Sequence, residues 1–82
     1  MNTVKDYKVL NGYRIWLRFE DGFESTISLK PLLNKGIALE LLDVTVFEKV
    51  TIESGGGLAW ENGFDICPNI LRTLSEEKAP VV

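Results

Sequence analysis

Apolar and polar residues alternate along residues 13–19. The odd positions are apolar or aromatic, and the even positions are Arg14, Trp16 and Arg18. A period of two predicts a β-strand with one buried and one exposed face, which places Trp16 on the polar face between the two arginines. The preceding Asn11-Gly12 tolerates the positive φ angles of a type I′ turn. Residues 7–10 and 13–19 are therefore predicted to form a β-hairpin.

A third strand and a helical turn are expected after this hairpin. Residues 20–22, Glu-Asp-Gly, are typical of a turn, and residues 23–29 resume a composition that favours β-strands. The chain is thus predicted to begin with a three-stranded antiparallel meander. Pro31 ends the third strand because it has no N–H to donate. Residues 31–36 are expected to form a short helical turn that Gly36 closes and that Ser28 or Lys30 caps.

The middle of the chain predicts short elements. Residues 37–42 are mostly apolar but too few to show a period, so a helical turn and an extended segment are both compatible. Asp43 is expected to cap a single helical turn that runs to Glu48. Residues 50–53 and 58–60 predict a second hairpin, with the glycine-rich residues 54–57 as its flexible tip.

The C-terminal part predicts a turn followed by a helix. Residues 61–63, Glu-Asn-Gly, favour a turn, and Pro68 suits the first position of a helix that runs to about Leu74. Residues 76–80 are expected to be frayed. Together these elements predict a single α+β domain over residues 1–82. It contains a small antiparallel sheet made of the meander and the second hairpin, short helical turns and a C-terminal helix.

Composition narrows the classes of function. The formal net charge is −3 and the nine Lys and Arg residues are spread along the chain, so no basic stripe favours direct nucleic-acid binding. No apolar run approaches the ~20 residues of a membrane-spanning helix, so no membrane association is expected. The first residues lack the basic-then-apolar pattern of a signal peptide, which predicts a cytoplasmic protein.

Candidate catalytic chemistry is sparse. The chain has no histidine, which excludes Ser-His-Asp and Cys-His mechanisms and removes the commonest transition-metal ligand. Cys67 is the only cysteine, and its thiol would need activation by the helix that begins at Pro68, whereas a small packing role needs none. Four acidic residues stand at turns or helix starts, where capping explains them: Asp21, Asp43, Glu61 and Asp65. We predict no catalytic residue, no metal site and no cofactor.

Two other features invite a functional interpretation. Residues 54–57 lack the helix and lysine that follow in phosphate-binding loops, so a hairpin tip is favoured. Arg14, Trp16 and Arg18 combine residue types that are enriched at binding hot spots, and they form our candidate interaction surface. The alternative is that the C-terminal helix or a loop covers Trp16, with the arginine stems packed beside its ring.

The order of several motifs resembles a known family. These motifs are Phe19-Glu20-Asp21-Gly22, Leu29 with Leu32-Leu33, Phe47 before Val50 and Ile52, and the string from Trp60 to Leu71. They are similar to the bacterial domain-of-unknown-function family 2442, whose most specific part is Trp-x-Asn-Gly-x-Asp-x-x-Pro-x-x-Leu. Ser28 departs from the aspartate that is usual in the family. The resemblance implies a small α+β fold and no established activity. It also implies a gene setting beside another small protein, which suggests a toxin–antitoxin-like pair.

Three hypotheses for function follow. The leading one is a non-enzymatic protein-interaction module, antitoxin-like or regulatory, whose unidentified protein partner contacts the face around Trp16 or an open sheet edge. The alternative is a small-ligand-binding domain with a pocket between sheet and helices at Trp60, Asp65 and Cys67. A hydrolase would need two acidic side chains in one cleft. A homodimer is compatible with each, because a short sheet with free edges gains from pairing.

Overall fold

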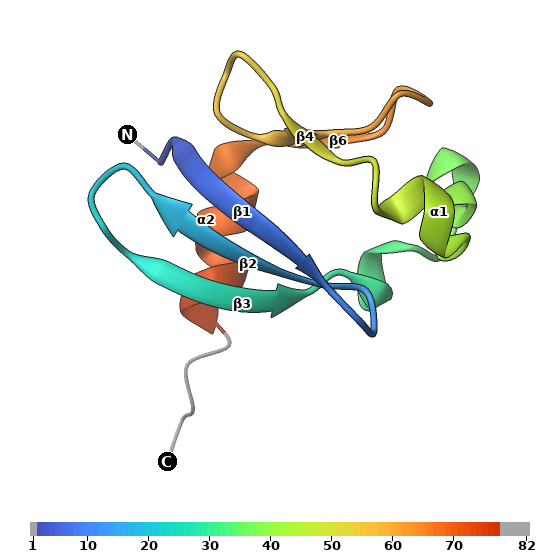
Figure 1. Ribbon diagram of the computed structural model, residues 1–82, viewed down its shortest axis with the longest axis horizontal. Coiled ribbons are helices and arrows are strands. Elements are labelled where there is room, and N and C mark those ends of the chain that lie inside the picture. The colour runs from blue at the N-terminus through green and yellow to red at the C-terminus, as the bar shows by residue number, and fades with distance from the viewer. Residues whose placement is uncertain (1, 78–82) are drawn as a thin grey trace.

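Two three-stranded antiparallel sheets and a C-terminal helix form the fold in the computed structural model, which describes residues 2–77 (Figure 1). The first sheet has the order β1 (Val4–Leu10), β2 (Arg14–Phe19), β3 (Glu24–Ser28). The second has the order β4 (Thr51–Ile52), β5 (Leu58–Ala59), β6 (Asp65–Ile66). The α+β class, the meander and the second hairpin are confirmed. β6 adds a strand that the sequence analysis did not predict.

The turn of the first hairpin is one residue longer than predicted. Arg14 pairs with Leu10, so residues 11–13 connect the strands. Gly12 and Tyr13 have φ angles of 71° and 59°, and Tyr13 therefore belongs to the turn rather than to the strand. The left-handed backbone at Tyr13 is held by tertiary contacts. Its hydroxyl donates to the Leu42 carbonyl, and its ring meets Phe47 edge-on with 5.4 Å between centroids.

Short 3₁₀ helices follow the meander. η1 (Lys30–Leu32) is preceded by Leu29 as its cap residue, with no side-chain hydrogen bond, so the predicted cap by Ser28 or Lys30 is wrong. The segment that the sequence left open forms η2 (Gly36–Leu42). Gly36 starts this second helix with φ 62° instead of closing the first one.

Two α-helices complete the fold. α1 (Val44–Phe47) is capped as predicted, because the Asp43 carboxylate accepts from the Thr45 N–H at 3.0 Å. α2 (Pro68–Glu77) begins at the predicted proline and keeps residues 76 and 77 helical, where fraying was expected. Residues 78–80 of the predicted frayed tail lie outside the described residues. Among residues 2–77, no helix has the length and apolar character that crossing a membrane requires.

The glycine-rich loop between β4 and β5 is packed, not a flexible tip. Gly56 and Gly57 are buried, and the Gly56 carbonyl accepts from the Val4 N–H at 3.0 Å. The loop therefore joins the second sheet to the start of β1. Glycine is needed here because a side chain at either position would meet other segments of the chain.

The core lies between the inner face of the first sheet, α2 and the second sheet, and the outer face of the first sheet is turned away from α2 (Figure 1). In the middle of α2, Arg72 lies over the Phe23 ring at 4.3 Å and pairs with Asp21 at 3.1 Å, which ties the helix to the β2–β3 turn. The buried apolar residues are Val4, Ile15, Leu17, Phe19, Ile27, Leu29, Leu33, Ala38, Leu41, Phe47, Val50, Leu58, Trp60, Ile66 and Leu71.

Candidate functional site

The outer face of the first sheet is built from three rows of side chains. The alternation of β2 buries Ile15, Leu17 and Phe19 and leaves the even positions outside, as predicted. The register with β1 and β3 then aligns cross-strand neighbours on the same face. The rows are Asp6–Arg18–Glu24, Lys8–Trp16–Thr26 and Leu10–Arg14–Ser28.

Trp16 stands at the centre of this face and is only partly covered. α2 packs against the opposite face through the fully buried Leu71, so the predicted alternative in which the helix covers Trp16 does not occur. Beside Trp16 lies a shallow hollow of about 380 Å³, which we name the Trp16 hollow. It is lined by Lys8, Leu10, Trp16 and Thr26. The sheet thus presents an aromatic ring with aliphatic and cationic neighbours.

The charges around the Trp16 hollow are unevenly neutralised. Arg18 pairs with Asp6 at 3.5 Å, and Glu24 is its cross-strand neighbour on the other side. Arg14 turns back to the hairpin, where it donates to the Asn11 carbonyl at 3.0 Å and to its side-chain oxygen at 2.8 Å. Within residues 2–77, neither Arg14 nor Lys8 forms an ion pair with a carboxylate. Uncompensated positive charge therefore lies at the Lys8 and Arg14 side of Trp16.

Arg14, Trp16 and Arg18 share one face, but the structure does not bring the three into one cluster. Both guanidinium groups are turned to neighbours of their own, and the hollow is completed by residues from β1 and β3 instead. Sequence reasoning missed Lys8, Leu10 and Thr26. Only the register of the three strands assigns these residues to Trp16, so alternation within one strand gave no signal for them.

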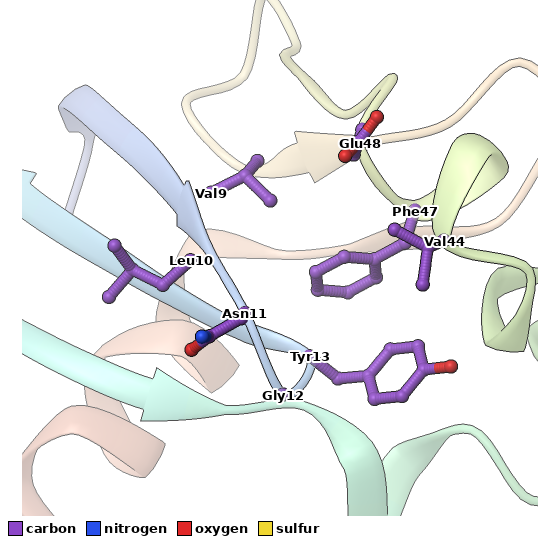
Figure 2. A pocket seen from close by; sticks show the side chains of 8 residues that line it. All are labelled: Val9, Leu10, Asn11, Gly12, Tyr13, Val44, Phe47 and Glu48. Carbon is purple, nitrogen blue, oxygen red and sulfur yellow. The ribbon is translucent and has the colours of Figure 1, made fainter.

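A second hollow of about 250 Å³ lies between the hairpin turn and α1 (Figure 2). The Phe47 and Tyr13 rings form its apolar walls together with Val9, and Glu48 brings the only charged side chain of its lining. Such a hollow can hold a small apolar group near a carboxylate. Its full lining is Val9, Leu10, Asn11, Gly12, Tyr13, Val44, Phe47 and Glu48.

A third hollow, of about 310 Å³, lies beside the turn after β5 and is lined by Glu40, Val46, Lys49, Glu61 and Asn62. The Asn62 amide donates to the Ile37 carbonyl at 3.1 Å and to a Glu40 carboxylate oxygen at 2.9 Å. Its donor capacity is therefore used to fasten η2 to the turn.

Comparison with known proteins agrees with the resemblance noted from the motifs. The family model described as "Protein of unknown function (DUF2442)" matches residues 4–77. The chain belongs to the DUF2442 family. No curated protein and no solved structure matches it. The family description states no activity, so functional argument for this DUF2442 protein rests on its own geometry.

The string from Trp60 to Leu71, which carried part of the resemblance to the DUF2442 family, also builds the fold. Trp60 is 5% exposed and donates its Nε1–H to the Phe47 carbonyl at 3.0 Å. Asn62 accepts from the Phe64 N–H at 3.0 Å, and Gly63 adopts φ 97° in the same turn. The helix begins at Pro68 and Leu71 is fully buried. Each of these positions has a structural role that needs no ligand.

The alternative ligand site of this DUF2442 protein was predicted at Trp60, Asp65 and Cys67. Trp60 is buried between aromatic neighbours, with ring centroids 6.1 Å from Phe47 and 5.5 Å from Phe64. Asp65 and Cys67 are exposed, and none of the three residues lines a hollow described above. A pocket at these residues stays a prediction.

Two acidic side chains of the DUF2442 chain, Asp21 and Asp43, fasten a turn and a helix start, whereas Asp65 lies on β6 rather than at a cap. Hydrogen bonds from the Arg72 side chain and the Phe23 N–H hold the pKa of Asp21 below its ordinary value of 3.8. Hydrogen bonds from the Thr45 side chain and backbone lower the pKa of Asp43 in the same way. Both groups are therefore ionised near neutral pH and unsuited to act as general acids. Residues 2–77 contain no group of three or more acidic or cysteine side chains that could hold a metal ion.

Proposed function

We propose that this DUF2442 protein is a non-enzymatic protein-interaction module that binds its partner at the Trp16 hollow. One observation carries the proposal: Trp16 is partly exposed beside Lys8 on a sheet face that α2 and the core leave uncovered. Tryptophan supplies a large apolar contact area with a polar N–H, and it is enriched among residues that dominate binding energy. A regulatory, antitoxin-like role in a two-protein system is compatible with such a surface.

The chemistry of the hollow supports a partner of complementary chemistry. Lys8 and Arg14 leave positive charge beside an apolar ring, whereas Arg18 is already paired with Asp6. A complementary segment carries an aliphatic or aromatic side chain for the ring and a carboxylate for the free cations. We therefore propose an acidic, apolar peptide segment of a partner protein as the occupant.

The non-enzymatic part of the proposal is supported by the side chains present. The sequence has no histidine, and Asp21, Asp43, Glu61 and Asp65 stand on separate elements. Glu61 shares a hollow with Glu40, but a Glu40 carboxylate oxygen there accepts from the Asn62 amide. Asp21 and Asp43 are held ionised by hydrogen bonds that fasten the fold. General acid–base or nucleophilic catalysis would need a differently tuned pair of groups.

Selection of random displayed peptides, followed by NMR mapping of the selected peptides on the ¹⁵N-labelled protein, tests this proposal. We expect enrichment of acidic peptides with an apolar side chain, and shifts at Lys8, Leu10 and Thr26 together with the Trp16 indole N–H. Trp16→Thr, which keeps a residue suited to a strand, and Lys8→Glu should both weaken binding at least about tenfold, the loss of one hot-spot contact.

Ile70→Ala is the matched control for this experiment. Ile70 is 50% exposed on α2, far from the outer sheet face, and its truncation should leave binding unchanged. Enrichment of basic or uncharged peptides would refute the proposed partner chemistry. Shifts confined to the hollow beside α1 would refute the proposed surface.

The hollow between the hairpin turn and α1 supports a second candidate, small-ligand binding. Its apolar walls, with Glu48 as the only charged side chain in the lining, suit a small apolar amine (Figure 2). A screen of small amines by the same NMR method should then perturb Val9 and Val44. If no fragment perturbs these residues at millimolar concentration, this candidate is excluded.

A further inference from the structure

We propose that a second copy of this chain pairs with the free edge of β3, so that two first sheets join into one continuous antiparallel sheet. β3 is the terminal strand of its sheet, and within residues 2–77 no segment pairs beyond it (Figure 1). This inference concerns self-association, so it goes beyond the proposed function and needs no partner protein.

The backbone geometry shows which groups the β3 edge offers. The Leu29 N–H donates to the Tyr13 carbonyl, and the Phe19 N–H donates to the Phe23 carbonyl. Antiparallel pairing alternates, so the odd-numbered residues of β3 bond to β2 and the even-numbered residues point their N–H and C=O groups outward. The free edge therefore presents Glu24, Thr26 and Ser28 as an unpaired ladder.

The two edges of the first sheet are protected to different degrees. β1 contains a bulge between Val4 and Asp6 and carries Lys5 and Lys8, which are devices that discourage edge pairing. The Val4 N–H is also occupied by the carbonyl of Gly56. β3 has the sequence Glu-Ser-Thr-Ile-Ser, with no lysine, proline, glycine or bulge. Edge pairing is therefore expected at β3 and not at β1.

The β3 edge is complementary to itself when two copies pair antiparallel about Thr26. Thr26 then faces Thr26 of the second copy, and Glu24 faces the hydroxyl of Ser28, which can donate to its carboxylate. All five residues of the strand are paired, and no like charges stand opposite each other. A register centred on Glu24 would instead place two carboxylates together.

Pairing about Thr26 would also place the Trp16 hollows of the two copies on one face of the joined sheet. Thr26 lines that hollow, and Trp16 is its cross-strand neighbour on β2. Three strand spacings of about 4.8 Å place the two Trp16 residues roughly 14 Å apart on the same face of the joined sheet. The dimer thus presents two equivalent hollows related by a two-fold axis.

Charge substitutions at Thr26 test both the pairing and its register by sedimentation velocity. The wild-type chain should show a concentration-dependent dimer at or below about 1 mM protein. Thr26→Lys and Thr26→Glu each place two like charges opposite each other at the two-fold axis, and each should weaken the dimer roughly tenfold. In an equimolar mixture of the two variants, a lysine can face a glutamate across the two-fold axis, and a heterodimer should form.

Matched variants separate this proposal from the peptide site. Thr51→Lys places the same charge on exposed β4 and should leave self-association unchanged, as should Lys8→Glu on β1. Circular dichroism checks that every variant is folded. A wild-type chain that stays monomeric at about 1 mM, single variants that dimerise like wild type, or a mixture that stays monomeric would each overturn the proposal.

Discussion

Replacing Gly57 with alanine should destabilise the protein strongly, whereas the same change at Gly55 should not. Gly57 is buried directly before β5, where a Cβ would come closer than 3.0 Å to the Ile66 carbonyl oxygen and to 3.1 Å from the Pro68 ring. Gly55 is exposed, and its Cβ would approach only the flexible end of Glu53 at 3.2 Å. Neither glycine has a left-handed φ angle, so the comparison isolates the steric effect.

The loss of stability expected for Gly57→Ala depends on which atoms must move to make room for the added Cβ. The obstacle at Gly57 is a backbone carbonyl of β6, so relief requires separating β5 from β6 rather than rotating a side chain. Overpacking of this kind costs about 1–3 kcal/mol. Displacing the loop also strains the hydrogen bond from the Glu53 N–H to the Gly57 carbonyl, worth about 1 kcal/mol. Alanine also lowers the conformational entropy of the unfolded chain relative to glycine, which offsets about 0.4–1 kcal/mol of this loss in stability. The net loss is about 1–3.6 kcal/mol.

Urea unfolding followed by tryptophan fluorescence measures both variants. A loss of 1 kcal/mol lowers the urea midpoint of a small protein by about 0.3–1 M, because the m-value is about 1–3 kcal/mol/M, so the Gly57 variant is well resolved from wild type. Gly55→Ala should lie within about 1 kcal/mol of wild type. If Gly57→Ala unfolds within about 0.5 kcal/mol of wild type, or if both variants are equally destabilised, the close packing of this loop is wrong.

Three further changes test the packing that supports the site. Trp60→Phe leaves a buried main-chain carbonyl without its donor and should cost about 1–3 kcal/mol in urea unfolding; stability equal to wild type would contradict the hydrogen-bond assignment. Asp21→Asn removes the carboxylate that pairs with Arg72, and the pKa of this carboxylate is lower in the folded protein than in the unfolded chain. Its destabilisation should be full above the unfolded pKa near 3.8 and vanish as pH falls through the lower folded value, and a pH-independent difference would refute this. Leu71→Ala should cost about 2–5 kcal/mol, while the adjacent, half-exposed Ile70→Ala stays within about 0.5 kcal/mol, and equal losses would contradict the orientation of α2.

Local sequence patterns were sufficient to predict the elements whose formation depends on neighbouring residues in the chain. The alternation along residues 14–19 correctly assigned the buried and exposed faces of β2, because side-chain direction in a strand follows from backbone geometry alone. Asp43 capped α1 and Pro68 began α2 for the same reason. The turn at Asn62-Gly63 and the helix start at Pro68 were also predicted from the string between Trp60 and Leu71, whereas Asp65 of this string lies on β6, which was not predicted.

Elements that depend on distant segments were not predictable from local pattern. β6 is two residues long and forms only because β5 offers it a partner. The packed state of Gly56 depends on the start of β1, which is far away in the sequence, and that of Gly57 depends on residues 66–68, which are separated from it by β5 and a turn. A glycine-rich composition is equally typical of a mobile tip, so composition could not separate the two.

The exposed position of Trp16 was determined by the sequence, but its surroundings were decided only by the tertiary structure. A two-residue turn at Asn11-Gly12 would pair Leu10 with Tyr13 and put Lys8 on the buried face of the sheet. Tyr13 instead enters the turn, because its ring and hydroxyl are held by α1 and η2, and this one added residue brings Lys8 beside Trp16. Side chains in a strand alternate with a period of two, so one residue of register decides which of them reach the same face.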